Sequence, residues 1–319
     1  MKKSTATALL ALGILSLSAA GEAKPAPEAT QTVSPKIRDL ISKLPRGSTH
    51  HLDVAYVSGG QPGAMREPSQ KLDLYVPAGK GPFPVVFWIH GGGWHSGDKL
   101  ESGIHLALKF LPKGFALAST NYRLTADAPF PAQIEDCNAA LAHLRHRADT
   151  YRIDADRVGT LGHSAGAHLA ALMACTGNEK HFSPDPLASL RVQAAVCWAI
   201  PADLDRDRGK WPKTSMMHNA VSAPLWSFFP NRRYDGEFAR MASPASYVHP
   251  EVPPILMVHG QQDELVPPEQ ALAFADSLEK AGASVTRRVV PDLGHNVMNA
   301  ESIQEALEFF TRILKSDQK

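Results

Sequence analysis

The segment 162–166, with the sequence Gly-His-Ser-Ala-Gly, constrains the fold more than any other part of the chain. It follows the apolar run 157–161 and opens a run of small and apolar residues, 167–174. This order is typical of a β-strand that turns sharply into an α-helix, with glycines on both sides of the turn. In such a turn the serine backbone is strained, its hydroxyl projects, and the N–H of the next residue stays free.

From about residue 51 onward, apolar runs alternate with amphipathic segments. Four runs are almost continuously hydrophobic, at 85–89, 115–118, 192–198 and 255–258. Strands that are buried on both faces of a parallel sheet have this composition. Between the runs, apolar residues recur at spacings of three and four, as in 134–148 and 303–314, which indicates helices that pack on the sheet. The sequence therefore predicts an α/β fold with a mostly parallel central sheet and helices on both faces.

The N-terminal segment 1–23 has the pattern of a cleaved signal peptide. Lys2 and Lys3 precede an apolar stretch from Ala6 to Ala20, and small residues follow. A membrane anchor would need roughly 20 apolar residues, and this stretch is shorter and interrupted. We therefore expect cleavage, no stable membrane insertion afterwards, and a periplasmic or secreted protein.

The rest of the chain divides into a short N-terminal part and one large domain. Residues 24–50 are predicted to be a flexible linker and N-terminal segment, because the stretch 21–36 is rich in Pro, Ala and Thr and has too little hydrophobic content to fold. Residues 51–319 form the predicted α/β domain, and 202–252 interrupts its alternation as a lid or cap insertion. Large apolar side chains in 202–252 either pack internally or line a substrate pocket, and Trp94 of the glycine-rich loop is a further candidate for that pocket. The candidates for the pocket are Trp94, Trp211, Met216, Trp226 and Phe228.

Charge and cysteine content exclude several classes of protein. The chain has 33 basic and 32 acidic residues, a net charge of +1, so we expect no nucleic-acid partner. The three cysteines, Cys137, Cys175 and Cys197, are too few for a disulfide scaffold and are predicted to be core residues. Their spacing leaves a single disulfide open. No pattern in the sequence indicates an oligomeric state.

Two loops downstream of Ser164 carry the residues that could activate its hydroxyl. A serine hydroxyl is a poor nucleophile near neutral pH and needs a histidine, itself held by a carboxylate, to accept its proton. Asp263 follows the buried run 255–258, and His295 follows the next predicted strand, around 284–290. Because the carboxyl ends of parallel strands share one edge of a sheet, we expect the three side chains to meet there.

Other residues near these positions are weaker candidates. His163 and His168 lie close to Ser164 in sequence, but a neighbour on the same turn is badly directed to take the hydroxyl proton. We interpret both as packing or hydrogen-bonding residues. Glu264 and Asp292 are the alternatives to Asp263, and we interpret them as solvated charges on loops.

The glycine-rich loop 90–94, His-Gly-Gly-Gly-Trp, follows the first of the central buried runs. Because glycines have no side chain, the backbone can turn N–H groups toward a developing negative charge. Each such donor contributes about 3 kcal/mol to stabilisation of the transition state. The loop lacks the Gly-Lys-Ser/Thr of a phosphate-binding loop, and Ser96 stands where a dinucleotide fingerprint needs Gly or Ala. A metal site on His90 and His95 lacks further ligands at suitable spacing. We predict no metal and no cofactor.

Five motifs in order resemble one known family. They are His-Gly-Gly-Gly-Trp at 90–94, Ser-Thr-Asn-Tyr-Arg-Leu at 119–124, Phe-Pro-Ala-Gln-Ile-Glu-Asp at 130–136, Gly-His-Ser-Ala-Gly-Ala-His-Leu at 162–169, and His-Gly-Gln-Gln-Asp at 259–263 with the later Gly-His at 294–295. Over about residues 66–315 the chain is similar to α/β-hydrolases of the hormone-sensitive-lipase and feruloyl-esterase-like (BD-FAE) type. The resemblance implies an α/β-hydrolase fold.

The resemblance also implies a function and a set of site residues. The implied catalytic residues are Ser164, Asp263 and His295. The implied oxyanion hole consists of Gly92, Gly93 and Ala165. Such a protein is a serine carboxylesterase that forms an acyl-enzyme, and the export signal favours small or polysaccharide-linked esters, such as acetyl or feruloyl esters, as substrates.

Two departures from the family pattern leave alternatives open. Ala167 replaces a common glycine, which leaves the preference for esters or amides open, and Trp94 replaces the Phe of many lipase-like members. An aryl-formamidase-like amide hydrolase would use the same residues, although export speaks against it. A non-catalytic binding module on this fold would usually lack a catalytic residue, and none is missing here.

Overall fold

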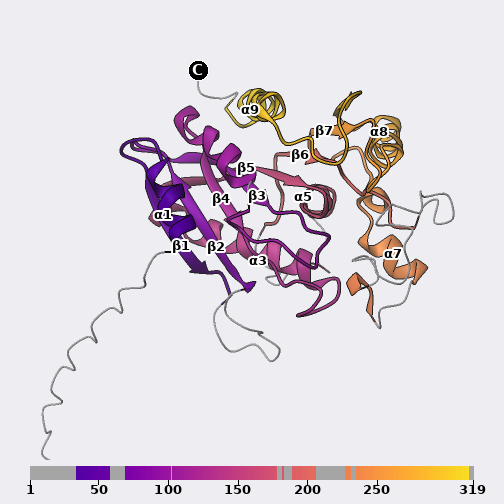
Figure 1. Cartoon of the computed structure of the whole chain (residues 1–319), viewed down its shortest axis with the longest axis horizontal. Helices are drawn as coiled ribbons and strands as arrows, with labels where there is room; N and C mark the ends of the chain where they lie inside the picture. The colour runs from indigo at the N-terminus through magenta and orange to yellow at the C-terminus, as the bar shows by residue number, and fades with distance from the viewer. Residues whose placement is uncertain are drawn as a thin grey trace, which may run out of the picture.

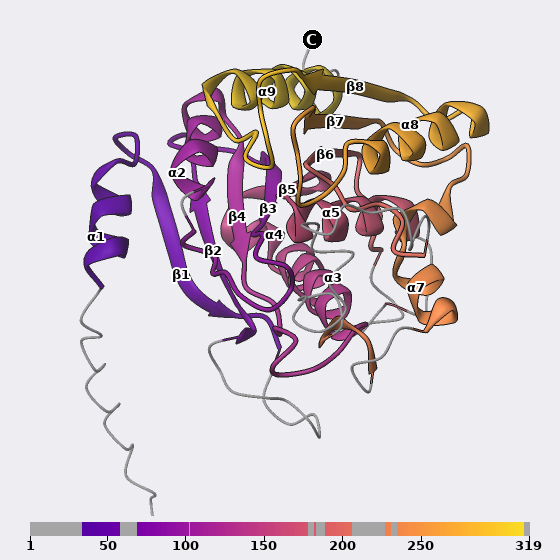
Figure 2. The same cartoon turned by 45° about the vertical axis from the view of Figure 1, so that its right-hand side comes forward.

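The computed structural model describes residues 34–57, 69–101, 103–177, 182, 189–205, 227–230 and 235–315. Figures 1 and 2 show a twisted sheet with helices on both of its faces, as the alternation of buried runs and amphipathic segments predicts. None of the helices in these ranges is long and apolar enough to cross a membrane.

Eight strands form one sheet in the order β1-β2-β4-β3-β5-β6-β7-β8. β2 pairs antiparallel with β1 and with β4, and every other pair of neighbours is parallel. The carboxyl ends of the central strands therefore lie at one edge. The strands are β1 (Thr49–Ala55), β2 (Lys71–Val76), β3 (Phe83–Ile89), β4 (Ala116–Thr120), β5 (Ile153–His163), β6 (Ala194–Trp198), β7 (Ile255–Gly260) and β8 (Val285–Val290).

The helices begin and end where local sequence signals place them. Asn299 caps the last helix by accepting a hydrogen bond from the Ser302 N–H at 2.9 Å, and Gly282 ends the preceding one in a left-handed conformation. The α-helices are α1 (Pro35–Ser42), α2 (Gly103–Ala107), α3 (Ala132–His146), α4 (Ala148–Tyr151), α5 (Ala165–Thr176), α7 (Gly236–Ala242), α8 (Glu269–Ala281) and α9 (Ala300–Leu314). Two 3-10 helices are η2 (Leu108–Lys113) and η5 (Pro244–Tyr247).

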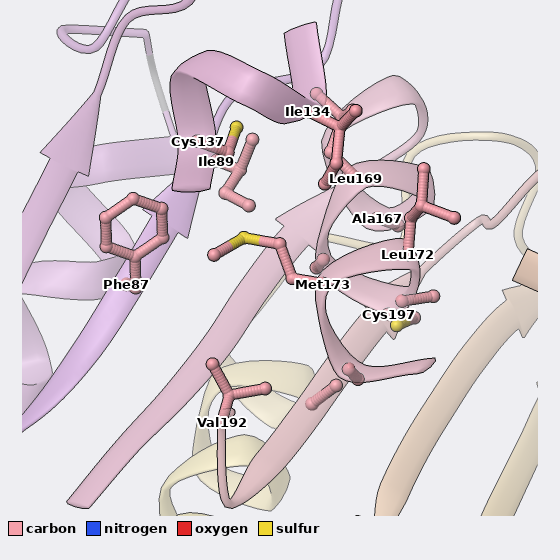
Figure 3. Packing of buried hydrophobic residues seen from close by; sticks show 14 of the residues in the cluster. Phe87, Ile89, Ile134, Cys137, Ala167, Leu169, Leu172, Met173, Val192 and Cys197 are labelled. Atoms are coloured by element: carbon pink, nitrogen blue, oxygen red, sulfur yellow. The ribbon is translucent and has the colours of Figure 1, made fainter. Parts of the chain in front are cut away.

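Two hydrophobic clusters lie on opposite faces of the sheet. One contains buried residues of α3, α5 and α8, and the other contains those of α2 and α9. In the first cluster, Met173 of α5 extends toward Phe87 of β3 (Figure 3). The three cysteines are buried and free, two of them in α3 and α5 and one in β6.

The N-terminal predictions fall partly outside the described residues. The predicted signal peptide, 1–23, lies there entirely. Within the predicted linker and N-terminal segment, 24–50, the part from Pro35 onward forms α1 and the start of β1. Ser34 caps α1, and Ile37 and Leu40 are buried, so this short stretch carries enough apolar surface to dock.

Candidate active site

Ser164 lies on the sharp turn between β5 and α5. Its backbone has φ 56° and ψ −121°, a strained conformation for a residue other than glycine. Its N–H donates to the Trp198 carbonyl on β6 at 2.8 Å, which fixes the turn to the neighbouring strand. Gly166 allows the turn to approach β3, because a Cβ atom there would overlap the Ile89 carbonyl. The serine hydroxyl is thus held at the carboxyl edge of the sheet.

Ser164, His295 and Asp263 form a continuous line of hydrogen bonds. The Ser164 hydroxyl lies 2.9 Å from Nε2 of His295, and Nδ1 of His295 lies 2.7 Å from Oδ2 of Asp263. Asp263 is on the loop after β7, and His295 is on the loop after β8. The structure therefore brings together three residues that are 99 and 32 positions apart in sequence, at the edge where they are predicted to meet.

Asp263 is an ionised acceptor. Burial acts to raise its pKa, but hydrogen bonds from His259 and His295 and the Val266 N–H outweigh this effect and hold the pKa of Asp263 well below its usual range. Its other oxygen accepts from the N–H groups of Leu265 and Val266, each at 2.9 Å. Because a carboxylate only accepts, Nδ1 of His295 carries the proton and Nε2 presents its lone pair to the serine hydroxyl.

His259 is a member of the site that the sequence analysis missed. Its Nε2 lies 3.1 Å from Oδ2 of Asp263 and 2.8 Å from the Val266 carbonyl, and the ring is buried. Two imidazole rings therefore contact the same carboxylate oxygen. The available signal is the spacing: His259 follows the apolar run 255–258 and stands four residues before Asp263.

The glycine-rich loop turns through an unusual backbone path beside Ser164. Gly92, Gly93 and Trp94 have φ values of 100°, 58° and 61°. At Gly92 a side chain is excluded, because a Cβ atom would overlap the Ser96 carbonyl. On the opposite side, Ala165 is the first residue of α5, and the N–H groups of a first helical turn have no partner within the helix. These groups can bind an oxyanion.

Buried polar contacts hold this loop from behind. The Gly91 N–H donates to Glu101 at 3.2 Å, and the Tyr122 hydroxyl donates to the His90 carbonyl at 3.1 Å. Further along, Nζ of Lys99 forms ion pairs with Asp73 at 2.9 Å and with Asp53 at 3.1 Å. Glu101 and Lys99 belong to no recognisable motif, so their positions in the sequence do not indicate that they support this loop.

Trp94 and Phe228 are packing residues, which corrects the prediction that they line a substrate pocket. Both side chains are fully buried, and their rings stack with centroids 4.4 Å apart. Nε1 of Trp94 also donates to Nδ1 of His168 at 3.3 Å. An aromatic side chain surrounded in this way presents no surface to a ligand. The other predicted pocket residues, Trp211, Met216 and Trp226, lie outside the described residues.

The weaker candidates for acid and base make other contacts. Nε2 of His163 contacts the His295 carbonyl at 2.9 Å, and Nε2 of His168 contacts the Ala242 carbonyl at 2.6 Å, so both are hydrogen-bonding residues as predicted. Glu264 and Asp292 are exposed on their loops. The described ranges contain no group of three or more His, Cys, Asp or Glu side chains arranged to hold a metal ion.

The chain is similar to known proteins in family, in sequence and in structure. The family model described as BD-FAE matches residues 72–278. Esterase LipQ of Mycobacterium tuberculosis is 33% identical over 251 residues, which cover 76% of this chain and 56% of LipQ. The probable carboxylic ester hydrolase LipM of the same organism is 30% identical over 257 residues, which cover 75% of this chain and 54% of LipM. This chain therefore spans about half the length of both relatives.

Among solved structures, a truncated carbohydrate esterase from gut microbiota superposes with a TM-score of 0.73 at 26% sequence identity. The alignment covers 84% of this chain and 96% of that structure. The similarity thus extends over nearly all of the carbohydrate esterase domain.

Proposed function

The chain belongs to the BD-FAE family of α/β-hydrolases, and we propose that it hydrolyses carboxylic esters through a covalent acyl-enzyme. The family and the fold confirm the resemblance predicted from the five motifs. Relatives and structural neighbours named as esterases and carboxylic ester hydrolases support the reaction class.

One observation carries the proposal: the line from the Ser164 hydroxyl through His295 to Asp263, with distances of 2.9 and 2.7 Å. In the first step, Oγ of Ser164 bonds to the ester carbonyl carbon while its proton moves to Nε2 of His295. Asp263 stabilises the imidazolium that forms. The N–H groups of Gly92, Gly93 and Ala165 stabilise the oxyanion.

The tetrahedral intermediate then breaks down to the acyl-enzyme, and water hydrolyses the acyl-enzyme in a second stage. The bond between carbon and the alcohol oxygen breaks, and His295 gives its proton to the departing alcohol. A water molecule next attacks the acyl carbon, and His295 accepts its proton and returns it to Oγ of Ser164. The carboxylic acid leaves and the enzyme is regenerated.

The proposed substrates are esters met outside the cytoplasm. The signal-peptide pattern of residues 1–23 supports a periplasmic or secreted location. The carbohydrate esterase similarity supports acyl groups on saccharides, with acetyl and feruloyl esters as the first candidates. A panel of acetyl, butyryl and feruloyl esters of one alcohol, with an N-formyl aryl amide beside them, would rank these substrates and test the formamidase alternative.

Ser164→Ala is the direct test. The variant should lose turnover of p-nitrophenyl acetate and labelling by a fluorophosphonate probe, because no other group then carries the acyl chain. Ser277→Ala is the matched control, since that hydroxyl bonds within α8 to the Ala273 carbonyl at 2.9 Å. Turnover by a folded Ser164→Ala protein would refute the proposal.

A further inference from the structure

His163, the last residue of β5, is in direct contact with His295 but takes no part in the reaction described above. Its ring is buried, with 9% exposure, and its Nε2 lies 2.9 Å from the carbonyl oxygen of His295. We propose that His163 is a positioning residue that holds His295 in place, above all while Ser164 is acylated. This inference rests on the proposed function.

The chemistry of the contact defines the state of the His163 ring. A carbonyl oxygen only accepts, so Nε2 of His163 carries a proton and donates it. Burial and the neighbouring His295 lower the pKa of His163 to about 4, so the ring is neutral at pH 7. The other titratable groups that face it are Asp263 and His259. A neutral donor holds the loop without placing a second positive charge beside His295 when that ring becomes an imidazolium.

The loop that carries His295 needs such an anchor. It has no regular secondary structure between β8 and α9. Backbone hydrogen bonds fix its first residues to the loop after β7, from Gln261 to the Val290 carbonyl and from Gln262 to the Leu293 carbonyl, each at 2.9 Å. His163 acts on His295 itself and ties its backbone to β5, one residue before Ser164.

His163 also lies close to the opposite side of the site. A Cβ atom added to Gly91 would lie 3.0 Å from the His163 carbonyl oxygen and 3.4 Å from Nδ1 of the His163 ring. The start of the glycine-rich loop therefore lies close beside this residue, with no room for a larger side chain at Gly91 unless a neighbour shifts. His163 thus contacts the loop that carries His295, lies beside the start of the glycine-rich loop, and is covalently next to Ser164.

Acylation changes which contacts hold His295. In the free enzyme the Ser164 hydroxyl and Asp263 fix the two ring nitrogens. Once Oγ of Ser164 is bonded to the acyl carbon, it has no proton to donate and that contact is lost. The contact from His163 involves no reacting atom and persists. His163 then keeps Nε2 of His295 in position to take the proton of the attacking water, so its loss should slow deacylation more than acylation.

The experiment compares His163→Met with His163→Gln, using p-nitrophenyl acetate and the purified protein. Both side chains have similar length, but only Gln has an N–H that can reach the His295 carbonyl. We expect His163→Met to lower kcat on the order of tenfold to hundredfold, because a small displacement of a catalytic group has effects of this size. KM should fall with kcat, and a burst of p-nitrophenol should precede the slow turnover. His163→Gln should recover most of kcat.

Several outcomes would overturn the inference. One is a His163→Met protein with the kcat of the wild type; another is an equal loss of kcat in both variants, which would indicate a requirement for ring shape alone. If His163→Met does not fold, His163→Asn replaces it, since the shorter amide does not reach the carbonyl. Labelling of the wild type by a fluorophosphonate, with no labelling of Ser164→Ala, separates failure of this inference from failure of the proposed function.

Discussion

The two sides of Ser164 are held in place by different means. On one side, the glycine-rich loop, proposed to bind the oxyanion, has positive φ values at Gly92, Gly93 and Trp94, and the buried side chains of Trp94 and, just after the loop, Lys99 anchor it. On the other side, the loops after β7 and β8 present Asp263 and His295, which are joined to Ser164 by side-chain hydrogen bonds. The first side is defined by its backbone conformation and by buried side chains behind it. The second side is defined by hydrogen bonds between side chains and by which nitrogen of His295 carries the proton.

This difference teaches which changes should separate activity from stability. The His295 side chain is 19% exposed, so its own replacement disturbs little packing, whereas the Asp263 side chain is buried and only an isosteric change there leaves the packing intact. Trp94 and Lys99 are almost completely buried, so changes near the glycine-rich loop affect the core as well as the site. Isosteric substitutions on the acid and base side should therefore reduce turnover with little effect on folding, and substitutions on the oxyanion side should reduce both.

Asp263→Asn should give the largest effect on turnover. The amide can donate to Nδ1 of His295, which moves the ring proton to Nε2 and leaves no lone pair for the Ser164 hydroxyl. We expect kcat to fall on the order of 10⁴-fold, as for the equivalent change in serine proteases. Steady-state kinetics and a thermal melt would test the expectation together. Asp292→Asn, at an exposed carboxylate on the His295 loop, is the matched control and should leave kcat unchanged. A similar loss in both variants would contradict the assignment.

Gly92→Ala should lower both turnover and stability. The added Cβ would overlap the Ser96 carbonyl in a backbone with φ 100°, so the glycine-rich loop must move. Loss of one oxyanion donor corresponds to a decrease in kcat of about 10² to 10³-fold. The control is Gly282→Ala, which has φ 87° at the end of α8 but no neighbour within 4 Å of the added Cβ. That variant should lose about 1–2 kcal/mol of stability from backbone strain and keep its turnover. Wild-type turnover in Gly92→Ala would contradict the proposal that this loop binds the oxyanion.

Acid should lower the stability of the protein, because two buried histidines in or beside the glycine-rich loop become protonated on unfolding. Burial lowers the pKa of both His90 and His168 to about 4, from an ordinary value of 6.5. Between these values the unfolded chain binds more protons than the folded one, so stability falls as the pH drops from 6.5 toward 4. Each ring contributes up to about 1.4 kcal/mol per pH unit to this slope.

Urea unfolding between pH 4 and pH 7 would measure this slope. His168→Gln should make it shallower by the contribution of one ring, because the amide does not titrate. Ser277→Ala, which removes no titratable group and changes only a hydroxyl bonded within α8, is the control and should leave the slope unchanged. An unaltered slope in His168→Gln would show that this ring is not the source.

Much of the fold could be predicted because hydrophobic runs report burial directly. The runs at 85–89 and 255–258 became β3 and β7, and Ser164 lies on the predicted turn. The order of strands in a parallel sheet then brings Ser164, Asp263 and His295 to one edge without any further information. Trp94 and Phe228 were misinterpreted because an aromatic residue has the same appearance in sequence whether it packs internally or lines a cavity.

By itself, the sequence determined the alternation of strands and helices, the turn at Ser164 and the identity of the residues that follow each central strand, because these depend on local pattern and on the rules of parallel sheets. Only the tertiary structure decided which side chains support the site. His163 acts through a contact to His295, which exists only once the loop after β8 has packed against β5. His259 and Glu101 contact residues only 4 and 10 positions away, but these contacts depend on the folded path of the loops after β7 and β3, which the sequence pattern does not specify.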